Sequence, residues 1–228
     1  MQLTGRDDGF TLVELLMSIA ILGIIAFPLG NAVISYLHNT DATIGRLGES
    51  HDAQIAAAYV AQDVQSIGTR NWTPGSYDAT TKTFLLQQSV WTAAGGVSNP
   101  CATTGTTVVQ FSWDDISTNS ATPPVPQIRV AYVVETDPSS GERQLHRVRC
   151  TASSSSAASN PPTTDIVLVH NLAAAGSDTA VAQVTCSTTC SGPSPAVPQT
   201  VTLTLTIDNP RNTDPPYLVT LTGQRRQS

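Results

Sequence analysis

The sequence predicts an α+β protein, in which one long N-terminal helix packs on an antiparallel β-sheet domain. Three observations predict this class. Residues 9–29 are almost wholly apolar, an amphipathic pattern continues from there to Gly68, and eight later segments have the composition of strands. The chain has 228 residues, enough for one domain of moderate size in addition to an anchor.

The first half of the helix has the length and composition of a membrane span. Residues 10–29 form an apolar run of about 20 residues, which crosses a bilayer as a helix at about 1.5 Å per residue. Leu, Ile, Ala and Met dominate the run and favour helix. Its one charge is Glu14. A carboxylate inside such a span is costly, so it marks a functional site by default.

The six residues from Gly9 to Glu14 read Gly-Phe-Thr-Leu-Val-Glu and resemble the N-terminus of type IV pilins and type II secretion pseudopilins. In that family a short polar leader ends in Gly, and Phe, Thr-Leu, a hydrophobic residue, Glu and an apolar helix follow. The resemblance implies that a prepilin peptidase cleaves between Gly9 and Phe10 and that the new amino group of Phe10 is methylated. It also implies that Glu14 faces the Phe10 amine of a neighbouring subunit during assembly, where low dielectric strengthens the attraction.

An ordinary secretory signal is the alternative for this segment. Such a signal is cleaved after its apolar region, next to small residues, whereas Gly9 precedes the apolar region and Glu14 lies inside it. One departure from the family is Asp7-Asp8, where many leaders carry Lys or Arg, so that Arg6 is the only basic side chain of the leader. Acidic residues weigh little in membrane orientation, and we expect a single-pass protein of the cytoplasmic membrane with its N-terminus in the cytoplasm.

The second half of the helix is amphipathic. Pro28 and the pair Gly45 and Gly48 are weak points, and Gly68 is the expected end, which makes a helix of about 90 Å. The predicted division is a leader at 1–9, a transmembrane or filament-core helix at 10–30, its amphipathic continuation at 31–68 and an extracytoplasmic β-rich domain at 69–228. The apolar residues that recur at helical spacing are Val33, Leu37, Ile44, Leu47, Ile55, Tyr59 and Ile67.

The remainder of the chain has the pattern of β-structure with long turns. Residues 201–207 alternate strictly, with four aliphatic side chains on one face and three Thr on the other. The turn sequence of residues 137–141, Asp-Pro-Ser-Ser-Gly, predicts a hairpin between its flanking strands. The candidate strands are Thr83–Gln88, Thr106–Trp113, Gln127–Glu135, Arg143–Cys150, Asp165–Asn171, Ala180–Cys186, Thr200–Asp208 and Tyr217–Gly223.

Four cysteines outside the membrane span indicate an oxidising compartment. They allow three pairings, of which we expect Cys101–Cys150 and Cys186–Cys190. The first pair joins the beginning of one candidate strand to the end of another and closes a loop of about 50 residues, worth about 4 kcal/mol. The second closes a small loop at a strand end. Zinc is the competing interpretation, but paired Cys-x-x-Cys spacing and nearby His are missing.

Net charge is −6, and no basic patch in the sequence favours nucleic-acid binding. Arg147 and Arg149 share one face of a candidate strand, which we expect to be solvated. The four histidines are scattered, and no nucleophile elbow, Cys-x-x-Cys motif or phosphate-binding loop is present. Asp114-Asp115 has oxygens suited to a hard cation, but we expect a solvated turn there. We therefore predict a non-enzymatic protein without a metal or cofactor.

The expected function is that of a minor pilin or pseudopilin, because the chain is long and carries many strands and extended polar loops. Scattered residues around Asp52, Asp63, Val130 and His146 look like the PilW- and J-type minor subunits. The resemblance implies prepilin peptidase, other pilin subunits, the membrane and an assembly platform as partners. The alternative is a membrane-anchored β-domain that acts as an adhesin or binding module, and an anchored extracytoplasmic enzyme is a further class without sequence support.

Overall fold

The computed structural model describes residues 9, 11–93, 101, 104–115, 125–152, 161–191, 197–209 and 215–226. The chain divides into two compact units, Met1–Gly45 and Arg46–Ser228. Helix α1 runs from Leu12 to Ser66, through Pro28 and both internal glycines, and ends two residues before the expected stop at Gly68. The α+β class is confirmed, because an apolar N-terminal helix and a large antiparallel sheet are present and the last turns of the helix pack on that sheet.

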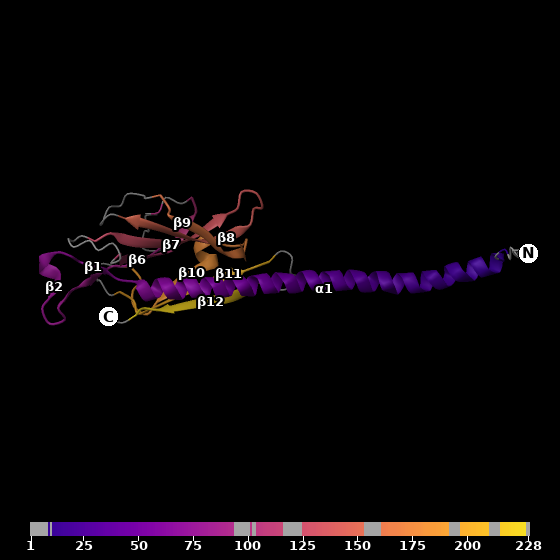
Figure 1. Ribbon diagram of the computed structural model, residues 1–228, viewed down its shortest axis with the longest axis horizontal. Helices are drawn as coiled ribbons and strands as arrows, with labels where there is room; N and C mark the ends of the chain where they lie inside the picture. The colour runs from indigo at the N-terminus through magenta and orange to yellow at the C-terminus, as the bar shows by residue number, and fades with distance from the viewer. Residues whose placement is uncertain are drawn as a thin grey trace, which may run out of the picture. The chain divides into compact units, whose positions relative to one another are not determined.

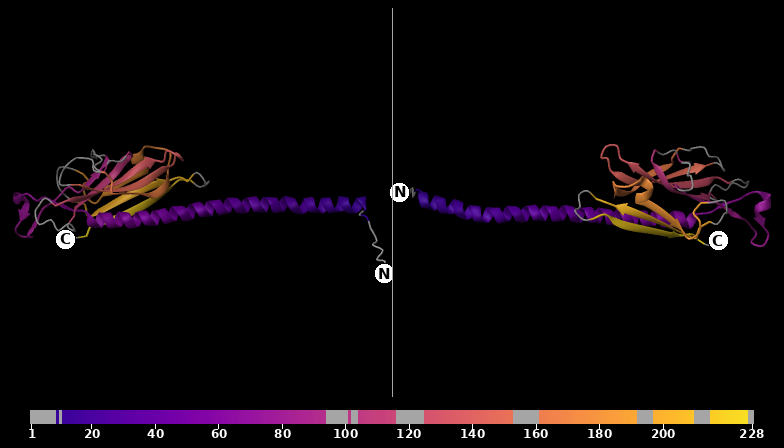
Figure 2. Two further views of the ribbon diagram at one scale, coloured as in Figure 1. Left: turned by 45° about the horizontal axis from the view of Figure 1, so that its top comes forward. Right: turned by 180° about the vertical axis from the view of Figure 1, so that it is seen from behind.

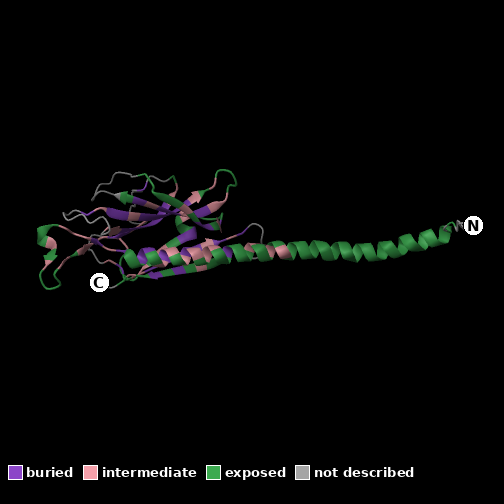
Figure 3. Ribbon diagram, in the orientation of Figure 1, coloured by how far each residue is buried: buried purple, intermediate pink, exposed green. Residues whose placement is uncertain are grey.

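In the first unit the apolar helix surface is exposed (Figure 3). Every described residue from Thr11 to Asn39 is exposed. α1 contains a stretch that is long and apolar enough to cross a membrane. The predicted domain boundaries, at 9/10, 30/31 and 68/69, stay predictions.

The second unit is built on an antiparallel sheet of eight strands in the order β10-β11-β9-β8-β7-β6-β5, with β12 on the other side of β11 (Figure 1). β9 and β11 meet at the pair Leu172 and Ile207, so the sheet has one part made of β5 to β9 and another of β10 to β12. The eight strands are β5 (Val90–Thr92), β6 (Thr106–Asp114), β7 (Gln127–Thr136), β8 (Arg143–Ala152), β9 (Thr164–Leu172), β10 (Ala182–Cys186), β11 (Thr200–Ile207) and β12 (Tyr217–Gln224).

Two of the predicted strands differ from the structure. The expected strand Thr83–Gln88 is wrong, because Leu85 separates two strands that pair with different partners. The expected strand Ala180–Cys186 is partly wrong, because a short helix, α2 (Asp178–Val181), occupies its beginning. The short elements are β1 (Thr69–Arg70), paired with β4 (Leu86–Gln87); η1 (Pro74–Ser76); and β2 (Tyr77–Asp78), paired with β3 (Thr83–Phe84).

The predicted hairpin at residues 137–141 is confirmed, since β7 and β8 pair antiparallel over ten residue pairs. Asp137 Oδ1 accepts hydrogen bonds from the N–H and the hydroxyl of Ser139, which closes the turn locally. Gly141 takes a positive φ of 73°, a conformation that glycine adopts without strain. The expected cores of β6, β7, β8, β9, β11 and β12 are likewise confirmed, with ends that differ by one or two residues.

The face of α1 that packs on the sheet contains only part of the predicted apolar stripe: Ile55 and Tyr59 pack against the core, and Ile67, just after the helix, is buried in it. The buried residues of the helix are Glu49, Ala56, Val60, Asp63 and Val64. Val33, Leu37, Ile44 and Leu47 are all more than half exposed, and the upper stripe residues Ile55 and Tyr59 are only partly buried. The buried face is made of small and acidic side chains because the helix approaches the sheet closely.

The helix approaches the sheet closely at Gly223 of β12, where the last turns of α1 lie beside the strand (Figure 2). A Cβ built on Gly223 would lie 2.5 Å from Val64 Cβ and 3.0 Å from the Val60 carbonyl oxygen. Atoms at such distances must shift, and the second of them is backbone. The absence of a side chain at Gly223 therefore sets the distance between helix and strand.

Gly223→Ala should lower the free energy of unfolding by about 1–3 kcal/mol, because the added methyl overpacks a backbone contact. The measurement is urea unfolding of the full chain in mild detergent. Gly75→Ala is the matched control, since nothing lies within 4 Å of a Cβ at Gly75. Adding Val64→Ala to Gly223→Ala should recover part of the loss. An unchanged midpoint for Gly223→Ala would show that the helix does not approach this strand.

Candidate functional site

The described part of the N-terminal motif forms a capping box at the start of α1. The N–H and the hydroxyl of Thr11 each donate a hydrogen bond to Glu14 Oε2 at 3.0 Å. In return the Glu14 N–H donates to Thr11 Oγ1 at 3.3 Å. This reciprocal pattern satisfies backbone donors that have no partner at a helix start. This capping role of Thr11 and Glu14 was not predicted, although the Thr-x-x-Glu spacing is its sequence signal.

The predicted roles of the remaining motif residues were cleavage at Gly9-Phe10, methylation of Phe10 and docking of its amine. Gly9 is described and exposed, whereas Phe10 lies outside the described residues. Glu14 is also exposed, and its carboxylate is held by Thr11 of its own chain. Exposed hydrogen bonds of this kind are exchangeable, so a stronger partner can replace Thr11.

A continuous apolar surface follows the capping box. Twelve large apolar side chains between Leu12 and Leu29 are each between 53 % and 77 % exposed. Exposed apolar surface of this extent marks contact with a membrane or with another protein. It surrounds the helix on all sides, as expected of a segment that is buried in lipid or in a bundle of helices.

Residues 5–29 match the family model described as the prokaryotic N-terminal methylation motif. The chain carries the motif that is characteristic of type IV pilins and pseudopilins. No curated protein and no solved structure matches the chain at a significant level. The match covers residues 5–9 of the predicted leader, the capping box and the apolar surface of this pilin-like chain, and the β-domain lies outside it.

In the second unit, three carboxylates of α1 bind the sheet, and we call Glu49, Asp52 and Asp63 the helix anchors. Asp63 binds Arg147 of β8 through two hydrogen bonds, from Nε at 2.7 Å and from Nη2 at 2.5 Å. The hydroxyl of Tyr132 on β7 donates to the same carboxylate at 2.7 Å. Asp63 is 1 % exposed and Arg147 is 8 % exposed, so solvation by water stabilises neither charge appreciably.

The electrostatics of this cluster keep Tyr132 and Arg147 protonated, as their hydrogen bonds to Asp63 need. Burial raises the pKa of Tyr132 well above its ordinary value, and the negative charge of Asp63 raises it further. Tyr132 therefore remains a donor. Burial alone lowers the pKa of Arg147, but the hydrogen bond and charge of Asp63 outweigh burial and raise that pKa. The guanidinium also lies 4.9 Å from the ring centroid of Tyr59, within reach of a cation–π interaction.

The expectation of a solvated face for Arg147 is therefore wrong. Arg147 and Asp63 lie 84 residues apart in the sequence, so alternation along β8 alone contains no sign of the partner. The sequence offers only a weak sign of this ion pair. Asp63 is an acidic residue near the end of the helix pattern, and the structure places the sheet beside that end.

The other two helix anchors are less buried. Asp52 Oδ2 accepts from the backbone N–H of His170 at 3.1 Å and lies 2.8 Å from its Nδ1. Glu49 accepts from Asn209 Nδ2 at 2.7 Å and from the Tyr217 hydroxyl at 2.9 Å. Burial and the bond to Glu49 raise the pKa of Tyr217, so this donor is also kept protonated. Together the three anchors connect α1 to β7, β8, β9 and β12.

The expected solvated turn at Asp114-Asp115 is wrong for its first residue. Asp114 ends β6, and its Oδ2 accepts the backbone N–H of Arg70 at 3.0 Å. Burial raises the pKa of the Asp114 carboxyl, and the bond from Arg70 opposes that effect. Asp114 therefore connects β6 to β1 as a structural acceptor. Among the described residues, no group of three His, Cys, Asp or Glu side chains is placed to hold a metal ion.

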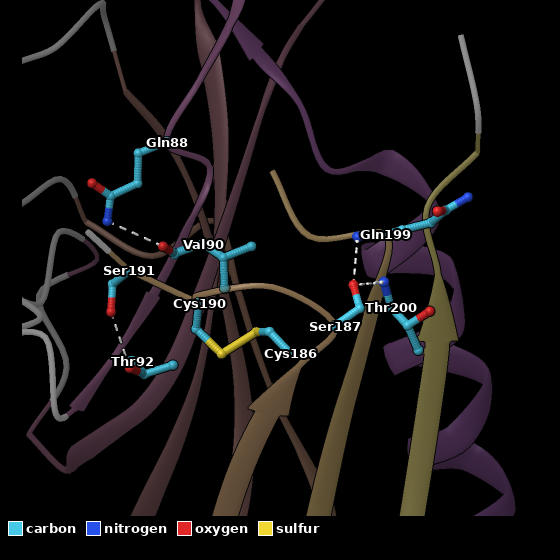
Figure 4. The surroundings of a disulfide bond; sticks show 9 residues. All are labelled: Gln88, Val90, Thr92, Cys186, Ser187, Cys190, Ser191, Gln199 and Thr200. Carbon is cyan, nitrogen blue, oxygen red and sulfur yellow. Dashed lines mark hydrogen bonds between the residues drawn. A yellow bond between two sulfur atoms is a disulfide. The ribbon is translucent and has the colours of Figure 1, made fainter. Parts of the chain in front are cut away.

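The four cysteines lie in the two pairs that the sequence reasoning expected. Cys101 and Cys150 are buried with Cα atoms 5.5 Å apart, on the face of β7 and β8 opposite to α1. Cys186 and Cys190 have Cα atoms 5.3 Å apart and close a short loop at the end of β10 (Figure 4). Beside this loop, Ser187 Oγ accepts from the N–H groups of Gln199 and Thr200, so the loop is fastened to the start of β11.

Asp63→Asn should lower the free energy of unfolding by about 3–5 kcal/mol, because it leaves the buried charge of Arg147 without a partner. Asp52→Asn is the matched control on the same helix. Its partner His170 is half exposed, so the expected loss is at most about 1 kcal/mol. Urea unfolding of the full chain in mild detergent measures both. Equal losses for the two variants would contradict the dominant role of the Asp63 cluster.

Proposed function

We propose that the chain is a minor pilin or pseudopilin, a non-enzymatic structural subunit of a type IV pilus or of a type II secretion-like filament. The observation that carries the proposal is the match of residues 5–29 to the N-terminal methylation motif, on a helix whose apolar surface is exposed. The motif and the exposed apolar surface support the same function. A processed subunit must first reside in the membrane and then bury that surface among other helices.

In this mechanism prepilin peptidase removes residues 1–9, and Phe10 becomes the methylated N-terminus. Residues 10–29 anchor the subunit in the cytoplasmic membrane with the β-domain outside. In the free subunit the Glu14 carboxylate is occupied by Thr11. During assembly the ammonium group of Phe10 from a neighbouring subunit replaces Thr11, because a charged donor forms the stronger hydrogen bond in a medium of low dielectric constant.

The β-domain has the features of a part that is displayed outside the cytoplasm. Its two cysteine pairs at disulfide distance suit an oxidising compartment. The expected partners are prepilin peptidase, sibling pilin subunits and the assembly platform in the membrane. The length of the chain and its extended loops support a minor position, because a major subunit must pack identical copies along the whole filament.

The first expected result is a change in intact mass. The protein is extracted from membranes of cells that contain a prepilin peptidase and of cells that lack it. We expect loss of residues 1–9 only where the peptidase is present, with one methyl group added on Phe10. Gly9→Val is the control, because a bulky residue at the cleavage position should preserve the precursor mass. An uncut chain in both cells, or cleavage after the apolar segment, would overturn the proposal.

The second expected result separates the two roles of Glu14. Glu14→Ala removes both the capping acceptor and the charge, whereas Glu14→Gln keeps an acceptor that completes a capping box and removes only the charge. Both variants should be cleaved normally and both should fail to enter filaments. The measurement is the amount of each variant in sheared filaments relative to that in membranes. Normal incorporation of Glu14→Gln would refute pairing with a neighbouring amine and leave only the cap.

A further inference from the structure

β12 is an edge strand without the usual protection. Among the described residues it pairs with β11 alone, over eight consecutive residue pairs without a bulge. Its sequence, Tyr-Leu-Val-Thr-Leu-Thr-Gly-Gln, contains neither a charged residue nor a proline. Natural proteins protect edges with short strands, charges, prolines, bulges or a covering element, because an open edge is a template for another chain. β12 is eight residues long, contains no charged residue or proline, and pairs with β11 without a bulge.

The hydrogen bonds of the neighbouring residues show which backbone groups face outward. The Arg225 N–H donates to the Gln199 carbonyl directly opposite, so Arg225 turns its backbone groups toward β11. Backbone groups alternate between the two sides of an antiparallel strand. The N–H and C=O groups of the even-numbered residues therefore face away from β11. These residues are Leu218, Thr220, Thr222 and Gln224.

A second, independent bond agrees with this alternation. The Ser187 N–H on the β10 side donates to the Thr200 carbonyl, so the even-numbered residues of β11 pair with β10 and its odd-numbered residues pair with β12. The open edge ends at Arg226, whose N–H donates to the Gln65 carbonyl at the end of α1. The helix end thus occupies the next outward position and leaves four open positions before it.

The side chains at the open positions are exposed, and Leu218 is 67 % exposed. Consecutive open positions are about 6.8 Å apart, since the rise is about 3.4 Å per residue. Only another extended backbone presents acceptors and donors at that repeat. The two faces of β12 then determine the pattern of the added strand: Leu221 and Gly223 are buried toward the core, whereas Thr220 and Thr222 face solvent.

We propose that the open edge of β12 binds an extended segment of another protein chain by β-strand addition. The segment is uncharged and alternates apolar with hydroxyl-bearing residues, so that its apolar side chains continue the core face and its hydroxyls continue the threonine face. Main-chain hydrogen bonds supply the affinity, and the alternation supplies the register. The proposal goes beyond the function as a filament subunit, because it stands on the sheet alone and needs neither cleavage nor Glu14.

Amide hydrogen exchange of the purified full chain in mild detergent is the first part of the test. In the protein alone, the amides of residues 218, 220, 222 and 224 should exchange rapidly, and those of 219, 221 and 223 should be protected. The second group is the internal control, because it pairs with β11. Slow exchange at the even-numbered positions would show that the edge is already covered and would overturn the proposal.

The second part uses a peptide with the sequence of β11, Thr-Val-Thr-Leu-Thr-Leu-Thr-Ile, as the probe. Bound at nine-tenths occupancy, it should slow exchange at the even-numbered positions by about tenfold. The same peptide with every backbone nitrogen methylated is the control; it has no N–H donor on either edge and should have no effect. Absence of slowing by the first peptide, or equal slowing by both, would overturn the proposal.

A pair of variants supplies a separate check on the protein side. Thr220→Pro and Thr220→Ala both remove the hydroxyl, but only the first removes an outward N–H, at a position where an edge strand tolerates proline. Thr220→Ala should bind the peptide normally and Thr220→Pro should lose at least about tenfold in affinity, or about 1.4 kcal/mol. Retained protection at 219, 221 and 223 shows that Thr220→Pro is folded. If it is not, the methylated peptide on the unmodified protein decides the question.

Discussion

The ion pair between Asp63 and Arg147 is the constraint on which the arrangement of the second unit depends. Two charges buried this deeply are tolerated only when each is fully hydrogen-bonded, and Tyr132 completes the shell around the carboxylate. Only one rotation of α1 about its axis, and one position along that axis, place Asp63 opposite Arg147. That same position brings Val64 against Gly223 and brings Glu49 and Asp52 to their partners on the sheet. The pair therefore specifies the register of the helix on the sheet more than it adds to stability.

In this register, the acidic side chains of the helix face the sheet, which is the reverse of the usual arrangement on a surface helix. The three acidic residues of α1 in the second unit bind the sheet, and apart from Arg46 its exposed face carries mainly uncharged residues such as Gln54, Ala58 and Gln62. A helix in water ordinarily turns its charges outward. Only part of the predicted apolar stripe packs on the sheet, because periodicity shows where apolar residues recur but not which of them the sheet reaches.

Apart from the Cys101–Cys150 pair, whose cysteines are 49 residues apart, the features that could be predicted from the sequence are local, and those that could not depend on distant parts of the chain. The motif from Gly9 to Glu14, the alternation of β11 and the turn at Asp137 are each contained in fewer than ten residues. The contact of Asp63 with Arg147 joins residues 84 positions apart, and no local pattern reveals it. The division of Thr83–Gln88 into β3 and β4 was missed because each short strand is defined by its partner, which propensity does not specify. The capping box is the exception, since it is local. Both Thr11 and Glu14 belong to the predicted motif, and only their hydrogen bonds to each other were not predicted.

Glu14 and Asp63 show two opposite uses of a carboxylate on one helix. Asp63 is surrounded by donors that are fixed in the core, so exchanging its partner would leave a buried charge unpaired. Glu14 is held by the backbone and hydroxyl of a residue three positions away, in an exposed site where each bond is replaceable. In the proposed assembly step, the Glu14 carboxylate must have hydrogen-bond partners beforehand, because an unpartnered carboxylate is costly in a membrane, and it must be held weakly enough to exchange them. The capping box meets both conditions, which gives the Thr-x-x-Glu spacing a physical reason inside the motif.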